Sequence, residues 1–224
     1  MTTPVLQTLA ARARGTGAAA LSCLGICAAL AGCGALPDKP SRVTMYDFGP
    51  GDTAPAPVAA PTLPTIALTE LETNPRLDGT QILYRLGYAD PNELRPYGQA
   101  RWSMAPTQMV RQRLRNGLSQ RRLVLNAEEN ASMTRAEGKA PDTLRVTVEE
   151  FSQYFDTPST SVGLVRLRAT MITGAPGGDR VRGQKTFTVQ RPAATADAPG
   201  GVKALAAATD AAVNDMVQWL DGLK

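Results

Sequence analysis

The feature that most constrains the fold is an alternation of apolar and polar side chains in the last third of the chain. Apolar Val165, Leu167, Ala169 and Met171 alternate with Arg166, Arg168 and Thr170. A period of two is typical of a strand with one buried face. The flanking segments repeat the pattern, with Leu144, Val146 and Val148 buried before it, and after it Val181, Phe187 and Val189 inside and Arg182, Gln184, Thr186 and Thr188 outside. We therefore predict three strands in one sheet.

The first of these strands changes parity near its middle. Phe151 and Phe155 fall out of phase with the apolar residues of 144–148, which indicates a bulge near Glu149 and Glu150. The glycine-rich segment 174–179 resembles a phosphate-binding loop in composition. A strand follows it rather than the helix that phosphate binding needs, so we interpret it as a hairpin turn.

Two segments have helical periodicity. Pro106 suits a first helical turn, and Val110, Leu114, Gly117 and Leu118 then share one face. The alanine-rich end of the chain, from about Gly201, carries a stripe of Val202, Leu205, Thr209, Val213, Met216 and Leu220, with Trp219 beside it. The expected fold is α/β (α+β), with a mixed, mostly antiparallel sheet packed by two main helices at about 106–120 and 201–221.

The remaining segments are shorter or more polar. We expect strands within residues 43–48, 65–71, 82–86, 99–103 and 123–125, and a possible hairpin at Asp78-Gly79. We expect loops at the Pro/Ala-rich 51–64, at "YADPNELRPYG" (88–98) and at the polar 126–140.

The start of the chain has the plan of a secretory signal. Arg12 and Arg14 precede an apolar run from Gly15 to Leu30, which is shorter than the ~20 residues of a membrane span. The run ends in Leu30-Ala31-Gly32-Cys33, which resembles the lipobox of bacterial lipoproteins. That resemblance implies cleavage between Gly32 and Cys33, acyl chains on Cys33 and, with Gly34 next, sorting to the outer membrane. The alternative is a structural cysteine that happens to end a signal.

The cysteine count agrees with the lipid interpretation. Cys23 and Cys27 would be removed with the signal, so Cys33 would have no internal disulfide partner. The expected organisation is a signal peptide at 1–32, a lipidated tether at 33–42 and a single domain at 43–224. Losing Arg12 and Arg14 lowers the formal net charge from +4 to +2, which does not demand a nucleic-acid partner.

The sequence offers little catalytic chemistry. It contains no histidine, which excludes Ser-His-Asp triads, Cys-His pairs and histidine metal sites. Glu149 and Glu150 are adjacent on a strand and are expected on opposite sides of the sheet, and Glu128 and Glu129 are expected in a polar loop. No Ser-x-x-Lys occurs after Cys33. We expect no enzyme activity, cofactor or metal.

Arg111, Arg113 and Arg115 follow one another on the first predicted helix. A solvated helix face is the simplest interpretation of this run. The alternative is a surface for a lipid headgroup or a partner.

Several motifs resemble the ABC-type transport auxiliary lipoprotein family. They are "YDFG" (46–49), the segment from Ile82 to Leu114 with Tyr84, Tyr97, Trp102 and Pro106, and the final "VQWL" (217–220). The opening strand departs from the family's usual "YYLL". The resemblance implies an outer-membrane-anchored periplasmic subunit that serves an ABC permease, an ATPase and a mammalian-cell-entry (MCE) type protein in intermembrane lipid transport. It allows homo-oligomers and implies no nucleic-acid partner.

The candidate partner or lipid surface consists of Arg166, Arg168, Arg182, Tyr84 and Trp102. A second hypothesis is a structural or regulatory outer-membrane lipoprotein for cell-wall synthesis or secretion-pore assembly. A periplasmic hydrolase is the third.

Overall fold

The computed structural model describes residues 42–50, 62–137, 140–175 and 177–223. The predicted signal peptide, Cys33 and most of the tether lie outside the described residues. The elements, in chain order, are β1 (Thr44–Tyr46), β2 (Ile66–Leu68), β3 (Glu72–Thr73), the 3-10 turn η2 (Pro75–Leu77), β4 (Gln81–Leu86), β5 (Asp90–Trp102), α2 (Pro106–Ser119), β6 (Val124–Leu125), α3 (Ala127–Glu137), β7 (Asp142–Phe155), β8 (Ser161–Thr173), β9 (Arg180–Pro192) and α4 (Ala198–Asp221).

The long strand β7 organises the sheet. One of its edges pairs antiparallel with β8 over its whole length, and β8 pairs antiparallel with β9. Its other edge is shared by three short parallel strands, β2, β3 and β4 in that order. Beyond them, β4 pairs antiparallel with β5, β5 pairs parallel with β1, and β2 pairs parallel with β6. The result is the predicted mixed sheet.

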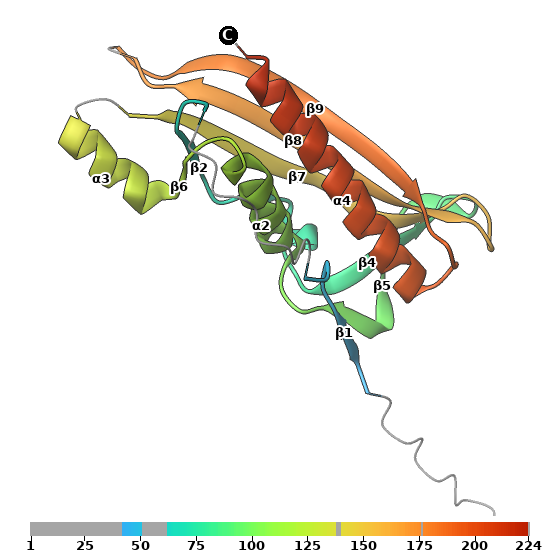
Figure 1. Cartoon of the computed structure of the whole chain (residues 1–224). Coiled ribbons are helices and arrows are strands. Elements are labelled where there is room, and N and C mark those ends of the chain that lie inside the picture. The colour runs from blue at the N-terminus through green and yellow to red at the C-terminus, as the bar shows by residue number, and fades with distance from the viewer. Residues whose placement is uncertain (1–41, 51–61, 138–139, 176, 224) are drawn as a thin grey trace, which may run out of the picture. The chain divides into compact units, whose positions relative to one another are not determined.

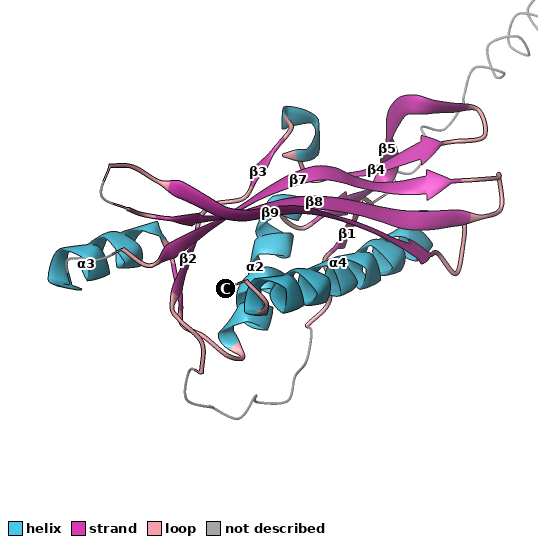
Figure 2. Cartoon of the chain, turned by 90° about the horizontal axis from the view of Figure 1, so that it is seen from above, coloured by secondary structure: helices cyan, strands magenta, loops and turns pink. Residues whose placement is uncertain are grey.

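The helices α2 and α4 cover one face of this sheet (Figures 1 and 2). The predicted stripe of α4 is buried throughout against strands whose alternate residues are also buried, among them Val165, Leu167 and Val189. Gly163 allows this approach, because a Cβ there would lie 2.5 Å from the backbone of Ala204 and Leu205 in α4. The predicted fold class is confirmed.

The helix α4 begins at Ala198, three residues before the predicted position, and Asp197 is its N-cap. The side chain of Asp197 accepts a hydrogen bond from the N–H of Gly200 (2.9 Å) and another from the hydroxyl of Thr195 (2.6 Å). An aspartate at the N-cap accepts a hydrogen bond from a backbone N–H of the first turn, which has no acceptor within the helix. The hydrogen bond from Thr195, and then that from Gly200, hold the pKa of Asp197 below its ordinary value.

The predicted bulge is confirmed, but the prediction that Glu149 and Glu150 lie on opposite sides of the sheet is wrong. Between the pairs Val148↔Leu167 and Phe151↔Val165, the two residues Glu149 and Glu150 stand opposite the single residue Arg166. The extra residue restores the apolar parity, so Phe151 and Phe155 are buried on the helix-covered side with the rest of the strand. Both carboxylates lie on the side of the sheet that faces away from the helices, and not one on each side.

The segment 126–140 is not a loop, because α3 occupies most of it. The N–H of Glu129 donates to the Asn126 side chain, and the N–H of Asn126 donates to the Glu129 carboxylate, both at 2.8 Å. This reciprocal pair is a capping box.

The segment 88–98 is not a loop either, since β5 begins at Asp90. Its prolines, Pro91 and Pro96, are tolerated because β5 meets β1 only at residues 100–102. Among the described residues the earlier part of β5 therefore has one unpaired edge, where a proline breaks no ladder.

Two smaller predictions are wrong as well. Asp78 and Gly79 make no hairpin, because the strand before them, β3, pairs with β7 and not with β4. Val181 is 64% exposed rather than buried. A register shift in β9 pairs Val181 with Ile172 and Gly183 with Met171, so Arg182 is an extra residue and the side of Val181 changes.

No helix in the described ranges is both long and apolar enough to cross a bilayer.

Candidate functional site

The face of β7, β8 and β9 that points away from α4 is the most distinctive surface of the domain. Figure 2 shows α2 and α4 on one side of these strands, whereas no helix of the described chain covers β8 and β9 on the other side. We call this surface the open face. Its polar side chains include Arg145, Thr147, Glu149, Glu150, Arg166, Arg168, Thr170, Gln184, Thr186 and Thr188.

The two carboxylates that β7 places on the open face are each bound by a guanidinium. Arg168 Nε lies 3.2 Å from Glu149 Oε1. Arg85, which reaches the same face from β4 in register with Tyr154, binds Glu150 through Nη2 (3.0 Å) and Nε (3.3 Å). The hydroxyl of Ser152 donates to Glu150 as well (2.7 Å). Both carboxylates are therefore held in place as partners of arginines.

The remaining arginines give the open face a positive balance. Arg166 is exposed and its Nε donates to Thr188 Oγ1 at 3.3 Å. Arg145 is exposed too, and no carboxylate of the described residues forms an ion pair with either side chain. With Glu72, which is exposed on β3 in register with Thr147, four arginines face three glutamates. Exposed guanidinium groups of this kind recognise carboxylates and phosphates through paired hydrogen bonds.

The five residues of the predicted surface do not come together. Arg166 and Arg168 lie side by side on the open face. Arg182 lies near the start of β9, where Nη1 binds Asp142 Oδ2 at 2.5 Å. Tyr84 is half-buried on the helix-covered side and stacks on Tyr97, with ring centroids 4.7 Å apart.

Trp102 cannot belong to a surface, because its side chain is fully buried. Its ring packs edge-on against Phe48 (5.7 Å) and Phe151 (5.9 Å). It is a core residue that fixes β5 and the segment after β1 to the centre of the sheet.

Sequence reasoning missed Arg145, Arg85 and the shared side of the two glutamates. The bulge was already visible in the parity of Phe151 and Phe155. In a bulge, two consecutive residues oppose one residue of the partner strand, so this signal could have placed Glu149 and Glu150 together.

A buried polar network lies under the first turn of α4. Tyr97 Oη donates to Gln153 Oε1 (2.8 Å), and Gln153 Nε2 donates to Ser161 Oγ (2.7 Å). Gly201 makes room for this amide, because a Cβ there would lie 2.0 Å from Gln153 Oε1. Burial raises the pKa of the Tyr97 phenol well above its ordinary value. The network is neutral and satisfied, which suits a structural role.

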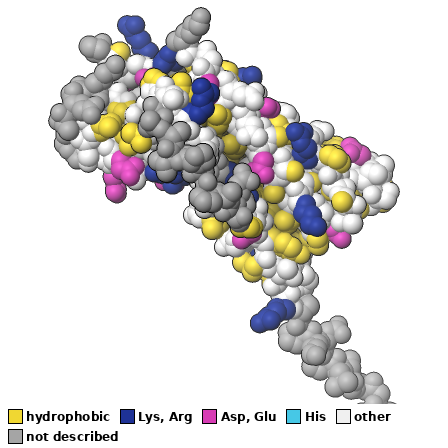
Figure 3. Space-filling model, viewed as in Figure 1, with side chains coloured by type: hydrophobic (Ala, Val, Ile, Leu, Met, Phe, Trp, Pro, Cys, Tyr) yellow, Lys and Arg dark blue, Asp and Glu magenta, His cyan; other side chains and the backbone are white. Residues whose placement is uncertain are grey.

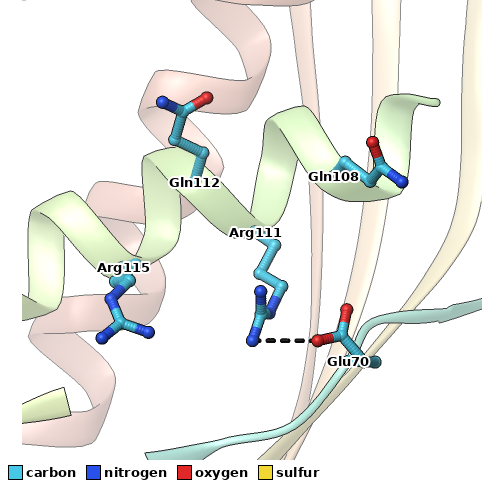
Figure 4. A pocket seen from close by; sticks show the side chains of 5 residues that line it. All are labelled: Glu70, Gln108, Arg111, Gln112 and Arg115. Carbon is cyan, nitrogen blue, oxygen red and sulfur yellow. Dashed lines mark ion pairs between the residues drawn. The ribbon is translucent and has the colours of Figure 1, made fainter. Parts of the chain in front are cut away.

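A shallow pocket of about 360 Å³ lies on α2 (Figure 4). It is lined by Glu70, Gln108, Arg111, Gln112 and Arg115. Figure 4 shows Arg111 and Glu70 pointing toward one another, and Arg111 Nη2 lies 3.0 Å from Glu70 Oε1. The pocket is polar and its central cation is already paired.

The three arginines of α2 do not form a purely solvated face. Arg111 binds Glu70, Arg113 Nη2 donates to the carbonyl of Phe48 (2.6 Å), and Arg115 lies 3.8 Å from Glu129. They connect α2 to the segment after β2, the segment after β1 and the first turn of α3.

Comparison with known proteins gives a family and a fold. A family model described as the ABC-type transport auxiliary lipoprotein component matches residues 46–217. No curated protein matches the sequence. Among solved structures, the fold resembles that of protein XCC0632 from Xanthomonas campestris, of the DUF330 family, with a TM-score of 0.64 and 20% identity over 80% of this chain and 94% of that one. It also resembles an uncharacterised protein with a TM-score of 0.55 and 14% identity over 80% of this chain and 99% of that one.

Proposed function

Because the chain belongs to the ABC-type transport auxiliary lipoprotein family, we propose that it is a non-catalytic docking subunit of an intermembrane lipid transporter. Acyl chains on Cys33 anchor it to the periplasmic face of the outer membrane. The domain then binds a periplasmic partner of the MCE type, which works with an ABC permease and ATPase. In this role it contributes to membrane integrity.

The cationic open face is the observation that carries this proposal. A sheet with helices on one side only leaves a broad, polar strand surface available to another protein. The positive balance of Arg85, Arg145, Arg166 and Arg168 over Glu72, Glu149 and Glu150 favours an acidic partner surface, and opposite charges accelerate association. The anchor strengthens such contacts, because confinement to a membrane raises the effective concentration of the two proteins.

The absence of catalytic chemistry supports a docking role. The sequence has no histidine. Within the described ranges, no three Asp, Glu or Cys side chains group in a way that could hold a metal ion. Glu149 and Glu150 are each paired with an arginine, so neither is positioned as a free base.

The test is purification of the native lipoprotein from cross-linked membranes, with the co-purified proteins identified by mass spectrometry. For the wild type we expect an MCE-type protein with its permease and ATPase. The variant Arg166→Glu/Arg168→Glu changes the balance of these open-face charges from +1 to −3 and should lose these partners. Recovery of cell-wall synthases alone would contradict the transport role.

The matched control is Lys185→Glu/Arg191→Glu. Both residues are exposed on β9 but pair in register with Ala169 and Gly163, whose side faces α4. The control therefore brings the same change of charge on the helix-covered side of the sheet, and it should retain the partners. Equal loss of partners in the control and in the open-face variant would mean that net charge, and not the open face, governs binding.

A further inference from the structure

Large apolar side chains gather at one end of the domain. Six are exposed in the described residues: Val43, Met45, Tyr88, Met104, Leu123 and Val181. Three of them lie close in the fold: Val43 (44% exposed) directly precedes β1, Met45 (56%) lies on β1, and Met104 (38%) belongs to the segment that follows β5. These two segments are neighbours, because Tyr46 pairs in register with Trp102 and its carbonyl accepts a hydrogen bond from the N–H of Ser103 (2.7 Å). We call Val43, Met45 and Met104 the β1 patch.

The side chains of the β1 patch do not pack on the hydrophobic core. Tyr46 and Phe48 turn inward and pack on the core, whereas Met45, which lies between Thr44 and Tyr46 on the strand, remains more than half exposed. Among the described strands β1 pairs only with β5, so it forms an edge of the sheet. Figure 3 shows hydrophobic side chains gathered at the lower end of the domain, where β1 lies. Apolar side chains that gather on a surface mark a binding site for a protein or a membrane.

The length of the tether limits the distance between the β1 patch and a membrane that holds Cys33. Ten peptide steps separate Cys33 from Val43. At roughly 3.6 Å or less for each residue they span at most about 36 Å. A lipid on Cys33 therefore keeps Val43 close to the bilayer. The sequence 33–42 carries Lys39 and Arg42 against Asp38, and this basic excess suits an anionic headgroup layer.

We infer that the β1 patch rests in the interfacial layer of the same membrane that holds the acyl chains. This inference rests on the proposed lipid anchor and adds a second contact, between the folded domain and the bilayer. Such a contact would orient the domain. In the strand order, β5, β4 and β7 separate β1 from β8, so the bilayer would contact the β1 edge of the sheet while the open face stays accessible to a protein partner.

The experiment uses the full-length, lipidated protein in vesicles of phosphatidylethanolamine and phosphatidylglycerol. Met45→Cys carries an environment-sensitive fluorophore, and Met104→Cys provides a second probe position in case the first variant folds poorly. The control is Val181→Cys, the most exposed of the six apolar positions, which lies on β9. Acylated Cys33 does not react with the label.

We expect the Met45 and Met104 probes to shift their emission to the blue, to be quenched by a nitroxide on the lipid and to be protected from aqueous iodide. The Val181 probe should show the reverse. If the protein floats with the vesicles but all three probes remain accessible to iodide, the membrane contact is refuted while the anchor stands. Protection from iodide without quenching by the lipid nitroxide would mean that a protein covers the patch, which also refutes it. A protein that does not float refutes the anchor and this inference together.

Discussion

Replacement of Gly163 by alanine tests how α4 is held on the sheet. The added Cβ would lie 2.5 Å from Ala204 C and Leu205 N and 2.8 Å from Ala204 O. These are backbone atoms inside a helix and cannot move individually, so α4 as a whole must shift away from β8. Overpacking of this kind costs about 1–3 kcal/mol, and we expect the upper end because no flexible side chain can yield.

The assay is thermal unfolding followed by circular dichroism. For a domain of this size, 3 kcal/mol lowers Tm by roughly 6–12 °C. The matched control is Gly98→Ala on β5, where a Cβ would meet nothing within 4 Å and the melting temperature should hardly change. A Gly163→Ala protein that melts with the control would refute the close contact between α4 and β8, and with it the assignment of the other face as the open one.

Three further substitutions probe separate contacts. Asp221→Asn leaves the guanidinium of Arg122, whose side chain is only 5% exposed, without its charged partner, and it should lower the free energy of unfolding in urea by about 3 kcal/mol. Asp197→Ala removes the cap of α4 and should cost about 1 kcal/mol at neutral pH. Since the pKa of Asp197 is depressed in the folded state, its contribution is complete above the ordinary aspartate pKa and disappears as the pH falls through the folded value, so wild type and variant should converge in acid. Arg166→Gln/Arg168→Gln loses one exposed ion pair, so unfolding should change by less than about 1 kcal/mol while partner recovery falls.

The sequence predicted those parts of the fold that depend on local periodicity. The alternation of β8 and the stripe of α4 were sufficient because each burial pattern repeats over several residues. Pro106 marked the first residue of α2 for the same local reason, since its missing N–H needs no partner there. Even the bulge in β7 was visible as a change of phase.

Features that depend on distant partners were not predictable in the same way. The strand character of β5 depends on β4 and on an edge that tolerates Pro91 and Pro96, and the parallel order of β2, β3 and β4 along β7 has no local signal. The helix α3 differs, because the capping box of Asn126 and Glu129 is a local signal for it, although the polar composition of 126–140 predicts a loop.

The candidate site was predicted in part. Alternation placed Arg166 and Arg168 on an outward face, which the register of β8 bears out. Whether another layer covers that face is a tertiary property, and so is the inward position of Trp102, since an aromatic residue at the end of a strand can face either way. Arg182 required knowledge of the register shift in β9.

The most direct test of the anchored docking subunit is the intact mass of the protein extracted from its native membrane. We predict a chain that begins at Cys33 and carries the added mass of a diacylglycerol and an N-linked acyl group. A chain with an unmodified Cys33 thiol would contradict the account.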